Sequence, residues 1–132
     1  MIGKFKVWDV KKKCWFKKTY EEFIITSDGE LKLFKWDGYR HYATSVSSDE
    51  YEKFFCSDIP DSNGKEIYEG DIVIIDDIIK RIFEVIYKKG YFGIIDIDDN
   101  FISFCDINNK DIEIIGHIKT NPKLIEKIID EK

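Results

Sequence analysis

The densest cluster of potential metal ligands in the sequence is the acidic run DIDDN at residues 96–100. Its first, third and fifth residues match the spacing of oxygen ligands in an EF-hand calcium loop. Such a loop needs glycine next and a bidentate glutamate at its end, but the sequence has Phe101 and Ile107 there. We therefore interpret the run as a turn whose side chains bond their own backbone, and we predict no metal site.

Cysteine and histidine add few further ligands. The three cysteines, Cys14, Cys56 and Cys105, are widely spaced and form no Cys-x-x-Cys pair, and His41 and His117 are the two histidines. A disulfide framework or structural zinc site is not expected from this spacing. We expect three thiols that are buried or half-buried.

Motifs for catalysis are equally scarce. Gly-x-Ser-x-Gly, the P-loop and Gly-x-Gly-x-x-Gly are all absent, and neither histidine lies near a nucleophile motif. Carboxylates that are adjacent in sequence, such as Asp76 and Asp77, point to opposite faces of a strand. The sequence therefore predicts no enzyme activity and no cofactor.

The segment WDGYRHY at residues 36–42 is the first candidate for binding. Trp36, Tyr39 and Arg40 are residue types that dominate protein interfaces, and aromatic rings beside a cation also suit single-stranded nucleic acid. The alternative is an aromatic hairpin turn at Asp37-Gly38 whose rings pack against one another.

Charge supplies the second candidate. The chain of 132 residues has a formal charge of −5, yet residues 1–20 carry seven lysines and one aspartate, which gives +6 there and −11 elsewhere. Lys11, Lys12, Lys13 and Trp15 could face an anion such as nucleic acid. The alternative is a solvated hairpin tip.

Composition limits the class of protein. Hydrophobic residues make up 43% of the chain and charged residues 36%, which excludes a disordered chain. No apolar run reaches the length of a membrane span, and the N-terminus lacks a signal-peptide core. We expect a cytoplasmic protein with no membrane partner.

Strand-forming residues dominate, since isoleucine occurs about two dozen times and Phe and Tyr together 17 times. In the first half, the patterns predict hairpins around Lys11–Lys13 and Ser27–Gly29, and a short helical turn over Tyr51–Phe55. In the second half, Asn63-Gly64 and Glu69-Gly70-Asp71 predict turns. Five strands are then expected, over residues 72–76, 81–87, 91–97, 101–106 and 111–115.

The predicted fold is mainly β: an N-terminal β-hairpin region plus a small SH3-like antiparallel barrel. A short C-terminal α-helix over residues 122–131 should cap the barrel, because Asn121 suits the N-cap and Pro122 the first helical position. We expect an N-terminal subdomain over residues 1–50 and a barrel over residues 51–132. The alternative is one continuous domain over residues 1–132.

Three stretches of the sequence match one family pattern in the same order along the chain. They are GKFKVWDVKKKCW at 3–15, NGKEIYEGDIV at 63–73 and IEIIGHIKTNPKLIE at 112–126. Together they resemble the YopX family of small proteins from phages and prophages of low-GC bacteria. The chain departs from that pattern at Asp58, where members have glycine, and at His117, where asparagine is usual.

The resemblance implies a mainly β protein carried by a mobile element and supplies no catalytic residues. Two functions follow as hypotheses. The first is a non-enzymatic interaction module that binds an unidentified host or phage protein, forms a homo-oligomer, or blocks a host protein by imitating nucleic acid with its acidic surface. The alternative is a nucleic-acid-binding small barrel that uses the basic N-terminal hairpin.

Overall fold

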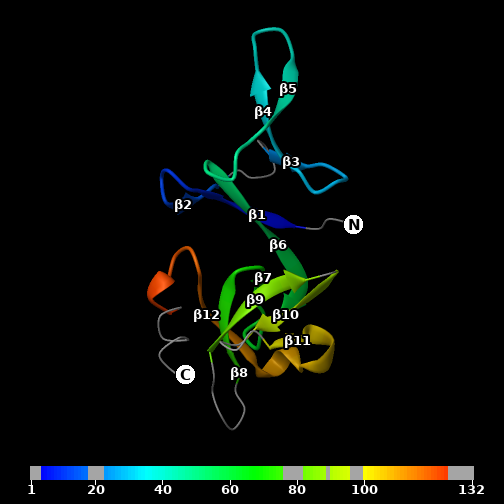
Figure 1. The fold of residues 1–132 in the computed structure, drawn as a ribbon, viewed down its shortest axis with the longest axis vertical. Coiled ribbons are helices and arrows are strands. Elements are labelled where there is room, and N and C mark those ends of the chain that lie inside the picture. The colour runs from blue at the N-terminus through cyan, green and yellow to red at the C-terminus, as the bar shows by residue number, and fades with distance from the viewer. Residues whose placement is uncertain (1–3, 18–22, 76–81, 89, 96–99, 125–132) are drawn as a thin grey trace. The chain divides into compact units, whose positions relative to one another are not determined.

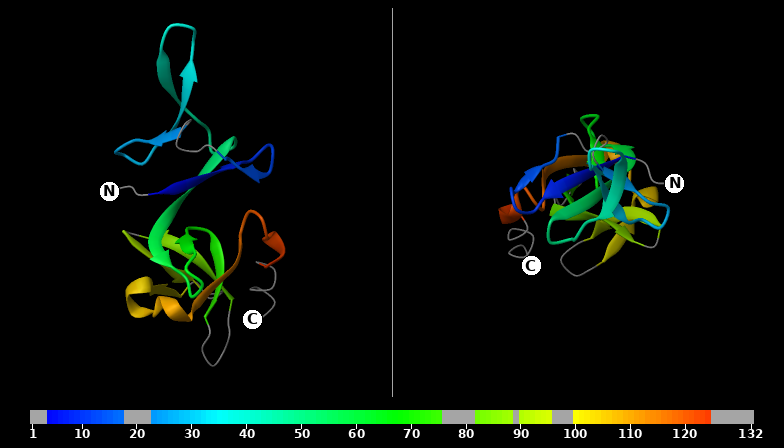
Figure 2. Two further views of the ribbon diagram at one scale, coloured as in Figure 1. Left: turned by 180° about the vertical axis from the view of Figure 1, so that it is seen from behind. Right: turned by 90° about the horizontal axis from the view of Figure 1, so that it is seen from above.

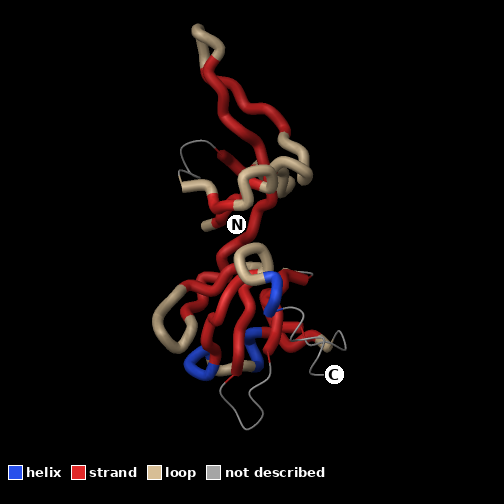
Figure 3. Tube along the Cα trace, turned by 90° about the vertical axis from the view of Figure 1, so that its left-hand side faces the viewer, coloured by secondary structure: helices blue, strands red, loops and turns tan. Residues whose placement is uncertain are grey.

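The computed structural model describes residues 4–17, 23–75, 82–88, 90–95 and 100–124 (Figure 1). Antiparallel strands dominate these residues, as Figure 3 shows, and residues 122–124 begin a short C-terminal helix. The predicted mainly β fold is therefore confirmed. The chain folds as two compact units, Met1–Phe55 and Cys56–Lys132.

The first unit is built around strand β1 (Phe5–Asp9), which pairs antiparallel with β2 (Cys14–Trp15). The turn between these strands contains the three consecutive lysines. Asp9 holds it, because its Oδ1 accepts a hydrogen bond from the Lys12 N–H at 3.0 Å. The hairpin predicted around Lys11–Lys13 is confirmed.

Strand β6 (Tyr51–Pro60) covers the other side of β1, in a register that runs from Phe5 opposite Phe55 to Asp9 opposite Tyr51. The predicted helical turn over Tyr51–Phe55 is therefore wrong. The Ser47 Oγ does accept from the Asp49 N–H, at 3.1 Å, but the chain then becomes extended. Pairing with β1 and ring packing within the first unit outweigh the weak local helix signal.

A three-stranded sheet completes the first unit, in the order β3 (Phe23–Ile25), β4 (Leu31–Trp36), β5 (His41–Ser45). The predicted Ser27–Gly29 turn joins β3 to β4, and Gly29 has a φ of 86°. The core of this unit consists of the buried side chains Phe5, Val7, Phe23 and Leu31.

In the second unit, β6 pairs with β7 (Glu66–Tyr68), and a curled five-stranded antiparallel sheet follows. Its order is β11-β10-β9-β8-β12. The predicted five strands are confirmed, except that residues 104–106 of the fourth form a 3-10 helix. The bounds are β8 Asp71–Ile75, β9 Ile82–Lys88, β10 Tyr91–Ile95, β11 Phe101–Ser103 and β12 Ile112–His117, with 3-10 helices at Phe104–Asp106 and Asn109–Asp111.

The core of the second unit is formed mainly by side chains from this sheet and from β7. Its buried members are apolar and come from nearly every strand of the unit: Ile67, Val73, Phe83, Val85, Ile94, Phe104 and Ile112. Burial of one such side chain stabilises a fold by about 1.5–3 kcal/mol. Ile72 on β8 is also fully buried but does not belong to this cluster.

The stretch from Asn63 to Val73 supplies both turns that the sequence predicted. Gly64 has a φ of 81° and Gly70 a φ of 85°, a left-handed conformation that favours glycine. At the second turn the Asp71 Oδ2 accepts from the Tyr68 N–H at 2.7 Å. The stretch therefore serves the fold.

His117, a departure from the family pattern, is buried and joins β12 to the Glu69-Gly70-Asp71 turn. Its Nδ1 accepts from the Lys119 N–H at 3.1 Å, so its Nε2 donates to the Glu69 carbonyl, 3.0 Å away. Asn121, the predicted N-cap, uses its Oδ1 to accept from the His117 N–H at 3.2 Å. Both polar side chains thus stabilise the end of β12.

Asp58, the other departure, has a φ of 61° where β6 changes register between Cys56 and Pro60. A side chain in this left-handed region is strained, and glycine is not. We therefore expect Asp58→Gly to raise the free energy of unfolding by about 0.5–1 kcal/mol. Urea denaturation measures this change, and Asp58→Ala, which keeps the strain, should not raise stability.

Several predicted features fall outside the described residues. They are residues 96–99 of the acidic run, the Asp76–Asp77 pair, the strand ends predicted at residues 76, 81, 96 and 97, and the helix beyond residue 124. Within the described part of the chain, no helix has the length and apolarity needed to cross a membrane.

Candidate functional site

The β4–β5 hairpin carries the predicted segment 36–42 at its tip (Figure 2). The Asp37 Oδ1 accepts hydrogen bonds from the backbone N–H groups of Tyr39, at 2.9 Å, and Arg40, at 3.0 Å. Gly38 has a φ of 98°, which a residue with a Cβ rarely adopts. The Asp37-Gly38 turn is confirmed, and it presents Tyr39 and Arg40 at the end of the hairpin.

Strand register places the aromatic residues on two faces. Trp36 pairs with His41, and Phe34 pairs with Ala43, so these four side chains share one face. The rings of Trp36 and His41 lie against each other, with centroids 4.8 Å apart and planes tilted by 48°. Tyr42 lies on the other face.

The aromatic residues remain accessible. The exposed fractions are 59% for Trp36, 92% for Tyr39, 38% for Phe34 and 39% for Tyr42. We call Phe34 and Trp36, together with Tyr39 and exposed Arg40 at the tip, the hairpin surface, and Tyr42 on the opposite face is not part of it. Large apolar rings exposed together mark interaction sites more often than rings exposed singly.

The second predicted site combined the three lysines with Trp15, but the lysines lie in an exposed turn and the Trp15 ring is packed. Lys11, Lys12 and Lys13 are exposed at the β1–β2 turn, at the tip of a different hairpin. Trp15 is half-buried, with its ring centroid 5.0 Å from that of Trp8. Trp15 also packs edge-on against Phe54 and lies 4.7 Å from the Nζ of Lys6. The structure thus groups Trp36, Tyr39 and Arg40 together and places the lysines elsewhere.

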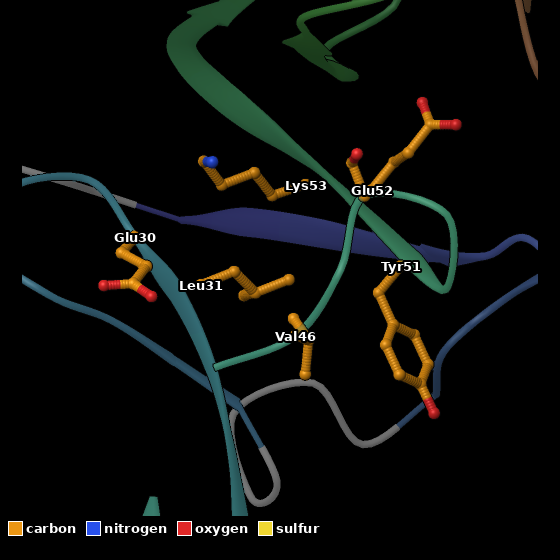
Figure 4. A pocket seen from close by; sticks show the side chains of 7 residues that line it. Glu30, Leu31, Val46, Tyr51, Glu52 and Lys53 are labelled. Carbon is orange, nitrogen blue, oxygen red and sulfur yellow. The ribbon is translucent and has the colours of Figure 1, made fainter. Parts of the chain in front are cut away.

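A pocket of about 290 Å³ lies at the base of the β4–β5 hairpin (Figure 4). Leu31 and Val46 form its apolar part, and the carboxylates of Glu30 and Glu52 lie at its margin. The Glu30 Oε1 accepts a hydrogen bond from the Ser45 Oγ at 2.6 Å. Ser48, Tyr51 and Lys53 complete the lining, so the pocket carries two carboxylates and one ammonium group.

No sequence motif distinguishes Phe34, Ala43 or the pocket. Phe34 and Trp36 are two residues apart in a strand, and this spacing alone places them on one face. Glu30 and Glu52 both line the pocket. They are far apart in the sequence, so no local sequence pattern shows that they are neighbours.

Asp37 supplies a pH-dependent test of the hairpin tip. Hydrogen bonds from the Arg40 and Tyr39 N–H groups hold the pKa of Asp37 below its ordinary value of 3.8. Its contribution to the turn is therefore complete above pH 3.8 and is lost as the pH falls through the lowered pKa. In an NMR titration, the amide signals of Tyr39 and Arg40 should shift together below pH 3.8, whereas in Asp37→Ala neither should show this step.

Other chemistry is limited in the described residues. Every buried side-chain nitrogen or oxygen among them has a hydrogen-bond partner, and no group of three His, Cys, Asp or Glu is placed to hold a metal. The thiol prediction is wrong for Cys14 and Cys105, which are exposed because they lie on a short edge strand and in a 3-10 helix. Burial raises the pKa of the Cys56 thiol, which makes it less reactive at neutral pH.

Comparisons with known proteins agree with this architecture. The family model described as YopX protein matches residues 4–126. The crystal structure of protein YopX from Bacillus subtilis is 23% identical, covers 94% of this chain and 98% of its own, and has a TM-score of 0.61. A crystal structure of a protein from Enterococcus faecalis is 24% identical, covers 95% and 99%, and has a TM-score of 0.56. A search of curated protein sequences gives no match.

Proposed function

The chain belongs to the YopX family, and from that premise we propose that it is a non-enzymatic protein-interaction module that acts through its hairpin surface. In this proposal a phage or prophage encodes it, and it acts in the cytoplasm of the bacterial host on a host or phage protein. The observation that supports it is the exposure of Phe34, Trp36 and Tyr39 on one hairpin.

Residue type and position both favour a protein partner. Trp, Tyr and Arg are the residues enriched at interface hot spots, and the hairpin surface combines all three within five residues. Hydrogen bonds from Tyr39 and Arg40 to Asp37 order the tip before binding, which lowers the entropy cost of association. We therefore expect an apolar patch on the partner, with an acceptor for Arg40.

Affinity capture from host lysate, with and without nuclease, tests the proposal. The double variant Trp36→Ala/Tyr39→Ala should capture at least about 10-fold less of a specific protein than the native chain does. This is the effect expected from the loss of one hot-spot residue. Tyr91→Ala is the matched control, because Tyr91 is also 59% exposed but lies on β10. Capture that is equal for the two variants, or that disappears with nuclease, would contradict the proposal.

Nucleic-acid binding is the second candidate function, supported by the three exposed lysines of the β1–β2 turn. Affinity would then fall steeply with salt, because each phosphate contact releases a counterion. The half-buried Trp15 leaves little ring surface for base stacking beside these lysines. Fluorescence anisotropy with labelled oligonucleotides at low salt, comparing the chain with a Lys11→Glu/Lys12→Glu/Lys13→Glu variant, distinguishes this candidate from the first.

A further inference from the structure

The outer edge of β5 carries no paired strand among the described residues, and we propose that it pairs antiparallel with β5 of a second copy of this chain. β5 ends the order β3-β4-β5, and four of its five residues are exposed. The proposal concerns the backbone edge of the hairpin and goes beyond the function proposed for its aromatic surface.

The backbone groups that point outward can be assigned from the turn. The Asp37 N–H donates to the Arg40 carbonyl at 3.3 Å, so Asp37 and Arg40 form a hydrogen-bonded pair. Such pairs alternate along antiparallel strands, so Tyr42 and Thr44 bond to β4. His41, Ala43 and Ser45 therefore direct their N–H and C=O groups toward the outer edge. Two copies of these three residues can form about six backbone hydrogen bonds.

Other sheet edges in the described residues are short or irregular. Strands β2, β3, β7 and β11 have two or three residues each, and β12 has a register shift between Ile114 and Gly116. Short strands and bulges are the usual protection against pairing between molecules. β5 has five residues, a regular register, and neither proline nor lysine. It is thus the edge best suited to pairing.

The residues of β5 also suit pairing with themselves. The strand HYATS contains no Asp, Glu, Lys or Arg, so antiparallel copies place no like charges opposite each other. Full overlap pairs Ala43 with Ala43 and His41 with Ser45. Ala43 is the only alanine in the sequence, and its small side chain at the two-fold axis keeps the centre of the interface free of steric conflict.

The same register brings opposite charges together at both ends. Arg40 of one copy lies opposite Val46 of the second, and residues opposite each other point to the same face. Val46 lines the pocket that has Glu30 and Glu52 at its margin. Arg40 of each copy therefore approaches a lining with one net negative charge in the second copy, since Glu30 and Glu52 outnumber Lys53. This complementarity favours a second copy over an unrelated extended peptide.

Sedimentation equilibrium of the full chain, with far-UV circular dichroism for folding, tests the pairing. The native chain and Ala43→Ser should form dimers. Ala43→Pro should raise the dimer dissociation constant at least about 10-fold with an unchanged spectrum, because proline removes an outward N–H that a single edge strand does not need. A native chain that is monomeric at millimolar concentration, or an Ala43→Pro dimer of native affinity, would overturn the proposal.

A charge variant gives a second readout. Arg40→Glu should also weaken the dimer, whereas Lys11→Glu, the same charge change on the other hairpin, should not. Equal effects of the two variants would overturn the predicted register. Ala43→Pro retains Trp36 and Tyr39, so the two proposals can fail separately. If no dimer is found but the monomer still captures a partner, the proposed function stands. If the dimer is found but no partner is captured, the dimer proposal stands.

Discussion

Replacement of Asp61 by alanine is expected to lower the free energy of unfolding by about 3–4 kcal/mol, a large part of the 5–15 kcal/mol typical of a domain. Asp61 is buried, and its Oδ1 accepts from the N–H groups of Asn63 and Lys65, both at 2.9 Å. Its Oδ2 accepts from the Ile114 N–H at 3.1 Å. Alanine would leave all three backbone donors without this acceptor.

Asp61→Asn separates the two roles of this carboxylate. The amide oxygen can still accept the two turn bonds, but the amide nitrogen would face the Ile114 N–H, donor against donor. We expect a smaller loss for this variant, about 2 kcal/mol, measured by urea denaturation. Asp111→Asn, which changes an exposed carboxylate of the same unit, is the control and should have little effect. Equal losses for Asp61→Asn and Asp61→Ala would contradict the assigned role of the turn bonds.

Gly93→Ala is expected to cost about 2–4 kcal/mol, because β10 has no room for a methyl group at this position. A Cβ on Gly93 would approach the Ile102 carbonyl oxygen and the Phe101 ring, both far inside van der Waals contact. The carbonyl belongs to the paired strand β11 and can move only if the β10–β11 pairing is disturbed.

A double-mutant cycle divides this cost. In the Phe101→Ala background the ring is absent, so Gly93→Ala should cost less than in the native chain, with the remainder due to the Ile102 carbonyl. Thermal unfolding of the four proteins measures the coupling. Strict additivity would show that the ring does not restrict this position.

Much of the fold could be predicted because its signals are local. Asn63-Gly64, Glu69-Gly70-Asp71 and Asp37-Gly38 each specify a turn through residues that tolerate positive φ, and the strands between turns follow. The departure from the family pattern at Asp58 falls where φ is 61°, a left-handed conformation that favours glycine.

What could not be predicted depends on contacts between distant segments. Tyr51–Phe55 follows a helix-capping serine, and only its pairing with β1 makes it a strand. Asp61 looks like an ordinary turn residue, because the bond to Ile114 joins positions 53 residues apart. For the candidate site, the sequence indicated Trp36, Tyr39 and Arg40 together. Their exposure, and the packing of Trp15, depend on the three-dimensional structure.

Photo-crosslinking in host cells tests the central claim, that the hairpin surface binds a protein, most directly. A benzophenone amino acid replaces Tyr39 in one variant and Tyr91 in another. Both side chains are exposed aromatics, but Tyr39 lies in the β4–β5 turn and Tyr91 on β10. We predict one specific covalent adduct from position 39, with a mass above that of two crosslinked copies of this chain. We predict no adduct from position 91. No adduct from position 39, or the same adducts from both positions, would contradict the account.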